Sequence, residues 1–156
     1  MSTSSVGSLA SINVSAGGVP KLPVPECRIS PQGLEGDRQR DLRYHGGLER
    51  AVSLFSLEQI QALQAEGHPI AAGSIGENLT LSGLSWSLVV PGARLRVGEV
   101  LLELTHYAAP CRNIAGAFAD GNMNRVSAKL HPGWSRLYAR VLEAGLVCEG
   151  DVIALE

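Results

Sequence analysis

Cys111 is the residue whose setting most favours covalent or metal-binding chemistry. It lies in the stretch THYAAPCRN, residues 105–113, between Pro110 and Arg112. Pro110 fixes the local backbone and lacks an N–H group, and the residues from Arg112 onward fit the start of a helix. A cysteine at the amino end of a helix and beside a cation has its thiolate favoured, and the thiolate is the form that attacks or binds metal. A small buried hydrophobic role is the alternative, and the residues alone leave both open.

The other two cysteines, Cys27 and Cys148, stand in apolar, strand-like surroundings that favour a structural role. The three cysteines are widely separated, so they suggest neither a disulfide framework nor a paired-cysteine site. Each thiol is therefore judged alone.

His45 is a candidate ligand or proton-transfer group, because the unperturbed pKa of histidine lies close to cellular pH. It precedes Gly46 and Gly47 and follows the segment GLEGD at residues 33–37. Such glycines let the backbone approach a ligand and let N–H groups cradle an anion, although they equally serve to turn the chain. The other histidines are scattered and no HExxH motif occurs, so a zinc site is not expected.

Asn78 and Thr80 form another candidate group, in the segment GSIGENLT at residues 73–80. Their amide and hydroxyl can hydrogen-bond a heterocycle, or they can close a turn on their own backbone. Spacing alone leaves these two roles open.

The composition indicates one soluble globular domain over residues 1–156, with 45% hydrophobic and 18% charged residues and a formal net charge of −2. Nucleic-acid binding is not expected, because the charged residues 37–43 fit a solvated mixed-charge loop better than a phosphate track. A cytoplasmic protein without a membrane span is expected, because no signal-like start and no apolar run of roughly 18 residues occurs. No nicotinamide, nucleotide, esterase or iron–sulfur motif occurs, so the electrons of any redox reaction would come from elsewhere.

Short strands must position these side chains. Residues 100–105 alternate apolar and polar side chains, as a half-buried strand requires, and they lead into the stretch that holds Cys111. Similar runs separated by glycine- and proline-containing turns occur at residues 6–14, 51–55, 86–90, 95–97, 138–142 and 152–155. The pattern predicts a mainly β fold, a barrel or sandwich of short strands.

Three helices are expected among the strands. Ser56 can cap a helix that ends at Gly67, because Gln59 stands three residues on and apolar residues then repeat at helical spacing. Residues 112–118 and the more weakly marked residues 125–130 are the other two expected helices.

The ordered motifs of the chain resemble those of the MOSC domain, the module named after the carboxyl-terminal part of molybdenum cofactor sulfurases. The resemblance covers nearly the whole chain. It rests on GLEGD at 33–37, HGG at 45–47 with Ala51-Val52, GENLT at 76–80, Pro91-Gly92, Gly98, the run 102–105, Pro110-Cys111, RVL at 140–142, Gly145 and Gly150-Asp151.

The resemblance implies a MOSC-type β-barrel of short, mostly antiparallel strands with a few peripheral α-helices. It also implies a site for molybdenum cofactor, a pterin dithiolene with a phosphate tail, in which Cys111 supplies a thiolate to molybdenum. Catalytic roles fall to Cys111 and His45. The expected cofactor-binding residues are Asn78, Thr80, Arg112, Asn113, Arg125 and Lys129. The cationic members of this set suit the phosphate or the pterin.

The resemblance further implies an oxidoreductase that reduces a small N-hydroxylated substrate with electrons from a separate reductase. The alternative is a non-catalytic cofactor-binding or sulfur-carrier module, with a persulfide on Cys111 that a cysteine desulfurase supplies. Many family members carry an arginine three residues before the cysteine, where this chain has Ala108. Arg112 or Arg125 is a candidate to take its place. A domain that kept the fold and lost the site is a third alternative.

Overall fold

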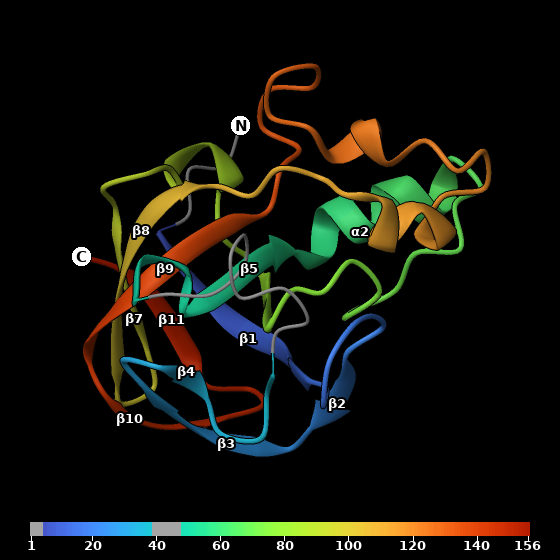
Figure 1. The fold of residues 1–156 in the computed structure, drawn as a ribbon. Helices are drawn as coiled ribbons and strands as arrows, with labels where there is room; N and C mark the ends of the chain where they lie inside the picture. The colour runs from blue at the N-terminus through green and yellow to red at the C-terminus, as the bar shows by residue number, and fades with distance from the viewer. Residues whose placement is uncertain (1–4, 39–47) are drawn as a thin grey trace.

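A sheet of eight strands closes on itself to form a barrel in the computed structural model (Figure 1). The structure describes residues 5–38 and 48–156. The sheet consists of β1 (Val6–Val14), β2 (Leu22–Val24), β5 (Val52–Ser56), β6 (Leu79–Ser82), β7 (Arg94–Val97), β8 (Val100–Tyr107), β9 (Leu137–Glu143) and β11 (Val152–Leu155). The barrel runs in the order β1, β11, β7, β8, β9, β5, β6 and back to β1, and β2 lies beside β1. The expected mainly β barrel is therefore confirmed.

A smaller sheet of three strands lies against one end of the barrel, at the bottom of Figure 1. It consists of β3 (Glu26–Ser30), β4 (Gly33–Leu34) and β10 (Gly145–Cys148), in the order β10, β3, β4. Strands β5 and β6 pair in parallel, and the other pairings of the described strands are antiparallel. The expectation of mostly antiparallel strands is confirmed.

The alternation of apolar and polar residues in the sequence predicted most strands of the barrel correctly. Strands β1, β5, β7, β8, β9 and β11 lie on the runs expected at 6–14, 51–55, 95–97, 100–105, 138–142 and 152–155. The strand expected at 86–90 is wrong, because Trp86–Leu88 form a 3-10 helix, η2. Leu88 N donates to Ser85 O at 2.9 Å in this turn, and the Trp86 ring packs edge-on against Phe55.

The first expected helix is confirmed as α2 (Leu57–Ala65), in which Ser56 Oγ accepts a hydrogen bond of 3.2 Å from Gln59 N. Residues 112–118 form a 3-10 helix instead, η3 (Arg112–Ala117). The helix expected at 125–130 is wrong, because η4 (Met123–Val126) covers only its first two residues and the backbone is extended again at Ser127. A further 3-10 helix, η1 (Leu48–Arg50), precedes β5. No helix of the described chain is long and apolar enough to cross a membrane.

Two groups of buried side chains hold the fold together. The larger group fills the barrel, with Leu54, Leu79 and Leu102 fully buried among its members. The smaller group lies under α2, where Ile60 of α2 joins Ile114 of η3. Figure 1 shows α2 and the η3 segment together on one side of the barrel. The smaller group therefore fixes the segment that begins at Cys111.

Candidate functional site

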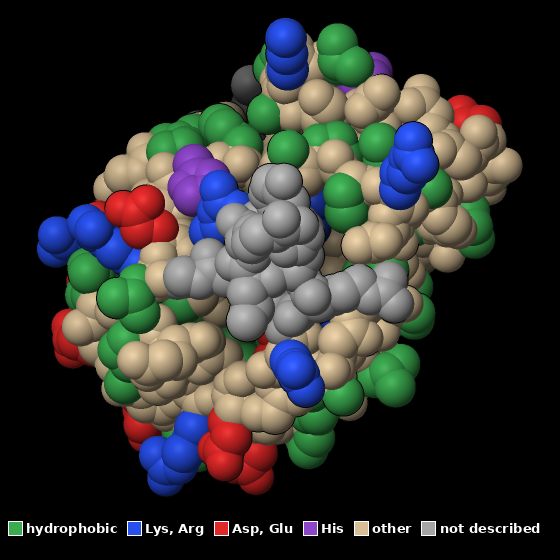
Figure 2. Space-filling model, viewed as in Figure 1, with side chains coloured by type: hydrophobic (Ala, Val, Ile, Leu, Met, Phe, Trp, Pro, Cys, Tyr) green, Lys and Arg blue, Asp and Glu red, His purple; other side chains and the backbone are tan. Residues whose placement is uncertain are grey.

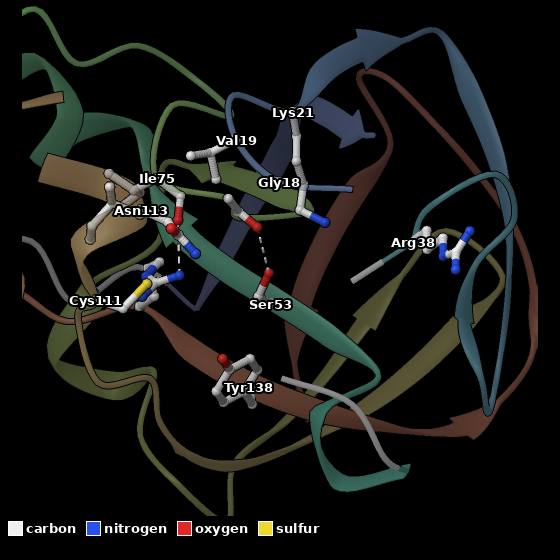
Figure 3. Close-up of a pocket in the computed structure, with 12 residues that line it drawn as sticks. Gly18, Val19, Lys21, Arg38, Ser53, Ile75, Cys111, Asn113 and Tyr138 are labelled. Carbon is white, nitrogen blue, oxygen red and sulfur yellow. Dashed lines mark hydrogen bonds between the residues drawn. The ribbon is translucent and has the colours of Figure 1, made fainter. Parts of the chain in front are cut away.

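An open pocket lies where barrel strands β5 and β9 meet the η3 segment. The pocket is lined by Gly18, Val19, Lys21, Arg38, Ser53, Ile75, Gly76, Cys111, Asn113, Ile114, Arg136 and Tyr138. Segments far apart in the sequence therefore build one cavity, and most of its residues are labelled in Figure 3.

Cys111 is the thiol of this pocket. It stands at the N-cap position of η3 and is half-buried, beside Asn113 and Ile75 in Figure 3. The expectation that it precedes a helical segment is confirmed, although the helix is a short 3-10 turn. Cys27 and Cys148 lie on β3 and β10, and burial raises the pKa of both thiols. Their expected structural role agrees with this placement.

Lys21 and Asp37 form an almost buried ion pair at the pocket wall. Lys21 Nζ lies 2.7 and 2.8 Å from the two carboxylate oxygens of Asp37. Asp37 Oδ2 also accepts a hydrogen bond of 2.9 Å from Asn78 Nδ2. The glycine-containing segment 33–37 is thereby tied to the start of β6, and Asp37 is a buried anchor rather than part of a solvated loop.

The side chains of Asn78 and Thr80 are fully buried behind the pocket and are not among its lining residues. Asn78 Oδ1 accepts from Ser53 N at 3.1 Å, and its Nδ2 donates to Asn13 O at 3.2 Å. Thr80 Oγ1 accepts from Asn13 Nδ2 at 3.1 Å and donates to Glu77 Oε2 at 3.1 Å. These bonds support the pocket wall from behind, and a direct contact of either residue with a cofactor stays a prediction.

Arg136 is the buried cation of the pocket, with 5% of the residue exposed. Its Nη1 donates to Ile75 O at 2.8 Å, and its Nη2 donates to Ala109 O at 3.2 Å. Its Nε is buried without a hydrogen-bond partner. Among the described residues no carboxylate lies within ion-pair distance of Arg136. The guanidinium therefore joins two walls of the pocket, and no carboxylate of the described residues forms an ion pair with it there.

Glu77 is a fully buried carboxyl group directly after Gly76 of the pocket lining. Its Oε1 has no hydrogen-bond partner, while Oε2 accepts from Thr80. Burial raises the pKa of Glu77 to about 7, and nearby Arg136 offsets part of this rise. Near neutral pH the carboxyl group is therefore partly protonated, which limits how far it neutralises Arg136.

Tyr138 brings a phenol into the pocket from β9. Its ring centre lies 5.3 Å from that of His106, its cross-strand partner on β8, and 5.7 Å from Arg50 Cζ. Arg50 Nε donates to His106 Nε2 at 3.2 Å. Burial raises the pKa of Tyr138, so the hydroxyl stays protonated at neutral pH and can donate a hydrogen bond into the pocket.

The remaining candidates are dispersed. Asn113 lines the pocket, whereas Arg112 and Lys129 are exposed and do not line it. Arg125 is engaged elsewhere, since its Nη2 pairs with Glu66 at 2.9 Å and its guanidinium stacks over Trp134 at 4.1 Å. His45 lies outside the described residues, so its role stays a prediction.

Basic side chains are dispersed over the face shown in Figure 2, without one continuous patch there. Among the residues described, no group of three or more His, Cys, Asp and Glu side chains is placed to hold a metal ion. The cationic side chains that line the pocket are Lys21, which is paired with Asp37, together with Arg38 and Arg136.

Sequence reasoning missed Lys21, Arg136, Glu77 and Tyr138. Lys21 and Arg136 are isolated cations in the sequence, and pairing of distant strands brings them to one cavity. Burial of Glu77 could have been predicted from the sequence. Its carboxylate lies between a glycine-containing turn and an apolar strand, a position that is commonly buried.

Comparison with known proteins agrees with the fold and the motifs. The family model of the MOSC domain matches residues 41–154. The uncharacterized protein YflK of Bacillus subtilis is 31% identical over 88% of this chain, and a protein named reductase from Gibberella moniliformis is 32% identical over 81%. The chain spans 62% and 23% of the lengths of these two relatives.

A solved structure resembles this one over most of its length. The crystal structure of YiiM from Geobacillus stearothermophilus has a TM-score of 0.72 and 25% identity, covering 96% of this chain and 75% of that one. The match of the family model to most of the chain, together with this shared barrel, shows that the chain belongs to the MOSC domain family.

Proposed function

We propose that this protein binds molybdenum cofactor in the pocket and reduces small N-hydroxylated compounds with electrons from a separate reductase. The observation that carries the proposal is that Cys111 shares one cavity with the cationic side chains of Lys21, Arg38 and Arg136. A soft thiolate suits molybdenum, and cationic donors suit a phosphate tail. Figure 3 shows Arg38 apart from Cys111, across Ser53, so the Arg38 charge and the thiol face different parts of the cavity.

The lining residues fit such a cofactor. A Cβ at Gly76 would stand 3.1 Å from Val19 and 3.9 Å from both Lys21 and Arg136. Glycine suits this position of the pocket wall, because its φ is +84° and a side chain would press against Val19. The buried guanidinium of Arg136, which has no ion-pair partner among the described residues, likewise suits an anionic group.

The reaction consumes two electrons and two protons per substrate, R–NHOH + 2 e⁻ + 2 H⁺ → R–NH₂ + H₂O. When bound, the molybdenum centre would supply the two-electron removal of oxygen from the N–O bond. Cys111 would hold the metal, and Arg136 would hold the anionic part of the cofactor. Tyr138 would donate a hydrogen bond to the leaving oxygen, because its hydroxyl is neutral and faces the same cavity. The relative named reductase supports the reductive direction.

Metal analysis tests this proposal. The wild-type protein and the variants Cys111→Ala and Cys148→Ala are purified from a host that makes the cofactor, and molybdenum and pterin are measured per chain. Wild type and Cys148→Ala should contain molybdenum and pterin in nearly equimolar amounts with the protein chain. Cys111→Ala should lose molybdenum. The proposal fails if wild type carries neither, or if Cys111→Ala retains both with full reductase activity.

The same purified proteins can also be tested for the alternative sulfur-carrier role. After incubation with a cysteine desulfurase and cysteine, intact-mass spectrometry would detect added sulfur on the chain. A sulfur adduct confined to Cys111, without bound molybdenum, would favour the carrier over the reductase.

A further inference from the structure

Ala108 and Arg136 are opposite each other on neighbouring backbones. The register of β8 and β9 pairs Tyr107 with Leu137, and Ala108 N continues it by donating to Arg136 O at 2.9 Å. Directly opposite residues of an antiparallel pair point to the same face, with Cβ atoms roughly 5 Å apart. A side chain at position 108 would therefore start close to that of Arg136 and on the same face.

We propose that Arg136 is the cation of this pocket that binds the phosphate group of the cofactor. This inference rests on the proposed function, because the anion is the phosphate group of the cofactor. It assigns the role to a residue 25 positions after Cys111 in the sequence rather than to Arg112 or Arg125. Arg112 is exposed, and Arg125 is engaged by Glu66 and Trp134.

The small side chain of Ala108 leaves room for the large side chain of Arg136. Ala108 is 1% exposed, so a longer side chain there would compete with Arg136 for the same buried space. Two guanidinium groups on directly opposite residues would also repel each other. The buried space therefore accommodates one arginine side chain, and in this protein that arginine is Arg136.

Hydrogen bonds hold the guanidinium in position, and no carboxylate of the described residues forms an ion pair with it. Its two terminal nitrogens donate to Ile75 O and Ala109 O, which fixes the plane of the group between the two walls. Lys21, by contrast, is already paired with Asp37 at 2.7 Å. Of these two buried cations, Arg136 is the one without an ion-pair partner among the described residues, and the planar guanidinium of arginine suits phosphate oxygens.

Phosphate binding to the cofactor-free protein tests the inference directly. The protein is made in a host that cannot synthesise molybdopterin, and inorganic phosphate is titrated by calorimetry or ³¹P NMR. The set is wild type, Arg136→Ala, the double variant Ala108→Arg/Arg136→Ala, and the control Arg140→Ala, whose side chain pairs with Glu103 outside the pocket. Near-ultraviolet circular dichroism checks that each variant is folded.

Arg136→Ala should weaken phosphate binding by about tenfold or more, as loss of a charge-assisted donor predicts. The double variant should recover most of the affinity, and Arg140→Ala should bind like wild type. Unchanged binding by Arg136→Ala would overturn the inference. If Arg136→Ala does not fold, the double variant decides: phosphate binding supports the inference, and absence of binding or of folding overturns it.

The molybdenum content of the wild-type protein from the cofactor-making host separates this result from the proposed function. The wild-type protein from that host could lack molybdenum while the phosphate affinities of the variants still follow the expected order. This result would support Arg136 as an anion-binding residue and would reject the reductase function. Bound molybdenum with phosphate binding that is indifferent to Arg136 would reject only the inference about Arg136.

Discussion

Lys21 Nζ lies 2.7 Å from Asp37 Oδ1, and only 8% and 5% of the two side chains are exposed. The pair joins the segment before β2 to the segment after β4, and Asn78 Nδ2 adds a hydrogen bond of 2.9 Å to the same carboxylate. One acidic residue thus fixes three parts of the chain around the pocket.

Asp37→Asn should lower the free energy of unfolding by about 3 kcal/mol, because it leaves the Lys21 ammonium buried without its counter-charge. Urea unfolding at pH 7 measures the change. Glu143→Gln is the control, because Glu143 pairs with Arg96 at the exposed surface and its loss should change stability little. Equal effects of the two substitutions would show that the Lys21–Asp37 pair is not held out of water.

Gly73 and Gly36 offer a matched pair of backbone tests, since both have a φ of +83°. At Gly73 a Cβ would collide with the carbonyl oxygen of Lys21, whereas no atom of the described residues lies within 4 Å of a Cβ at Gly36. Gly36→Ala should therefore cost about 1 kcal/mol of backbone strain. Gly73→Ala should cost at least about 3 kcal/mol, because a collision in a packed wall adds to the same strain. Thermal unfolding of both variants would contradict this if their melting temperatures fell equally.

Glu77 should make stability fall as pH rises towards neutrality. Burial raises its pKa from 4.5 to about 7 in the folded protein, so the folded state binds the proton more tightly than the unfolded state. The stability linked to this proton is complete below pH 4.5 and is lost as pH rises through 7, by an amount on the order of 3 kcal/mol.

Glu77→Gln should remove this loss while keeping an oxygen for Thr80. The variant should be more stable than wild type at pH 8, and the difference should shrink at pH 5. Unfolding free energies measured at both pH values check the sign. A variant that is less stable than wild type at pH 8 would show that the ionised carboxylate is stabilising.

The three thiols should react at different rates with iodoacetamide at pH 7.5. Cys27 is 7% exposed, and burial raises the pKa of the Cys27 and Cys148 thiols, which lowers their thiolate fraction. Cys111 lines the open pocket, so its alkylation should be the fastest. Peptide mass spectrometry over time gives the order. Faster labelling of Cys27 than of Cys111 would contradict the assignment of Cys111 as the pocket thiol.

Local features of the fold were predictable from the sequence because local interactions produce them. The Ser56–Gln59 cap joins residues only three positions apart, and the alternation at residues 100–105 reflects one buried face of a strand. The helix expected at 125–130 failed for a local reason too, since the Asn122 side chain caps a short 3-10 turn at Asn124 instead.

The site was predictable only in part. Cys111 and Asn113 line the pocket as candidates from the sequence, whereas Arg136 reaches it through strand register. Asn78 was chosen for its capacity to hydrogen-bond, and that capacity is used inside the protein, on Ser53, Asn13 and Asp37. A sequence shows which residues can form polar contacts, but only the paired strands decide whether the partner is the protein or a ligand.

The pairing of β1 with β11 has a kinetic consequence. Val6 lies opposite Ala154, so the contact that closes the barrel joins opposite ends of the described chain. When strands distant in sequence pair, the chain loses entropy on loop closure before the stabilising contacts form. Such non-local pairing therefore slows folding. During synthesis β1 must wait beside β6 with one edge open until β11 leaves the ribosome. The barrel is therefore expected to close last, and an incomplete chain exposes the edge of β1.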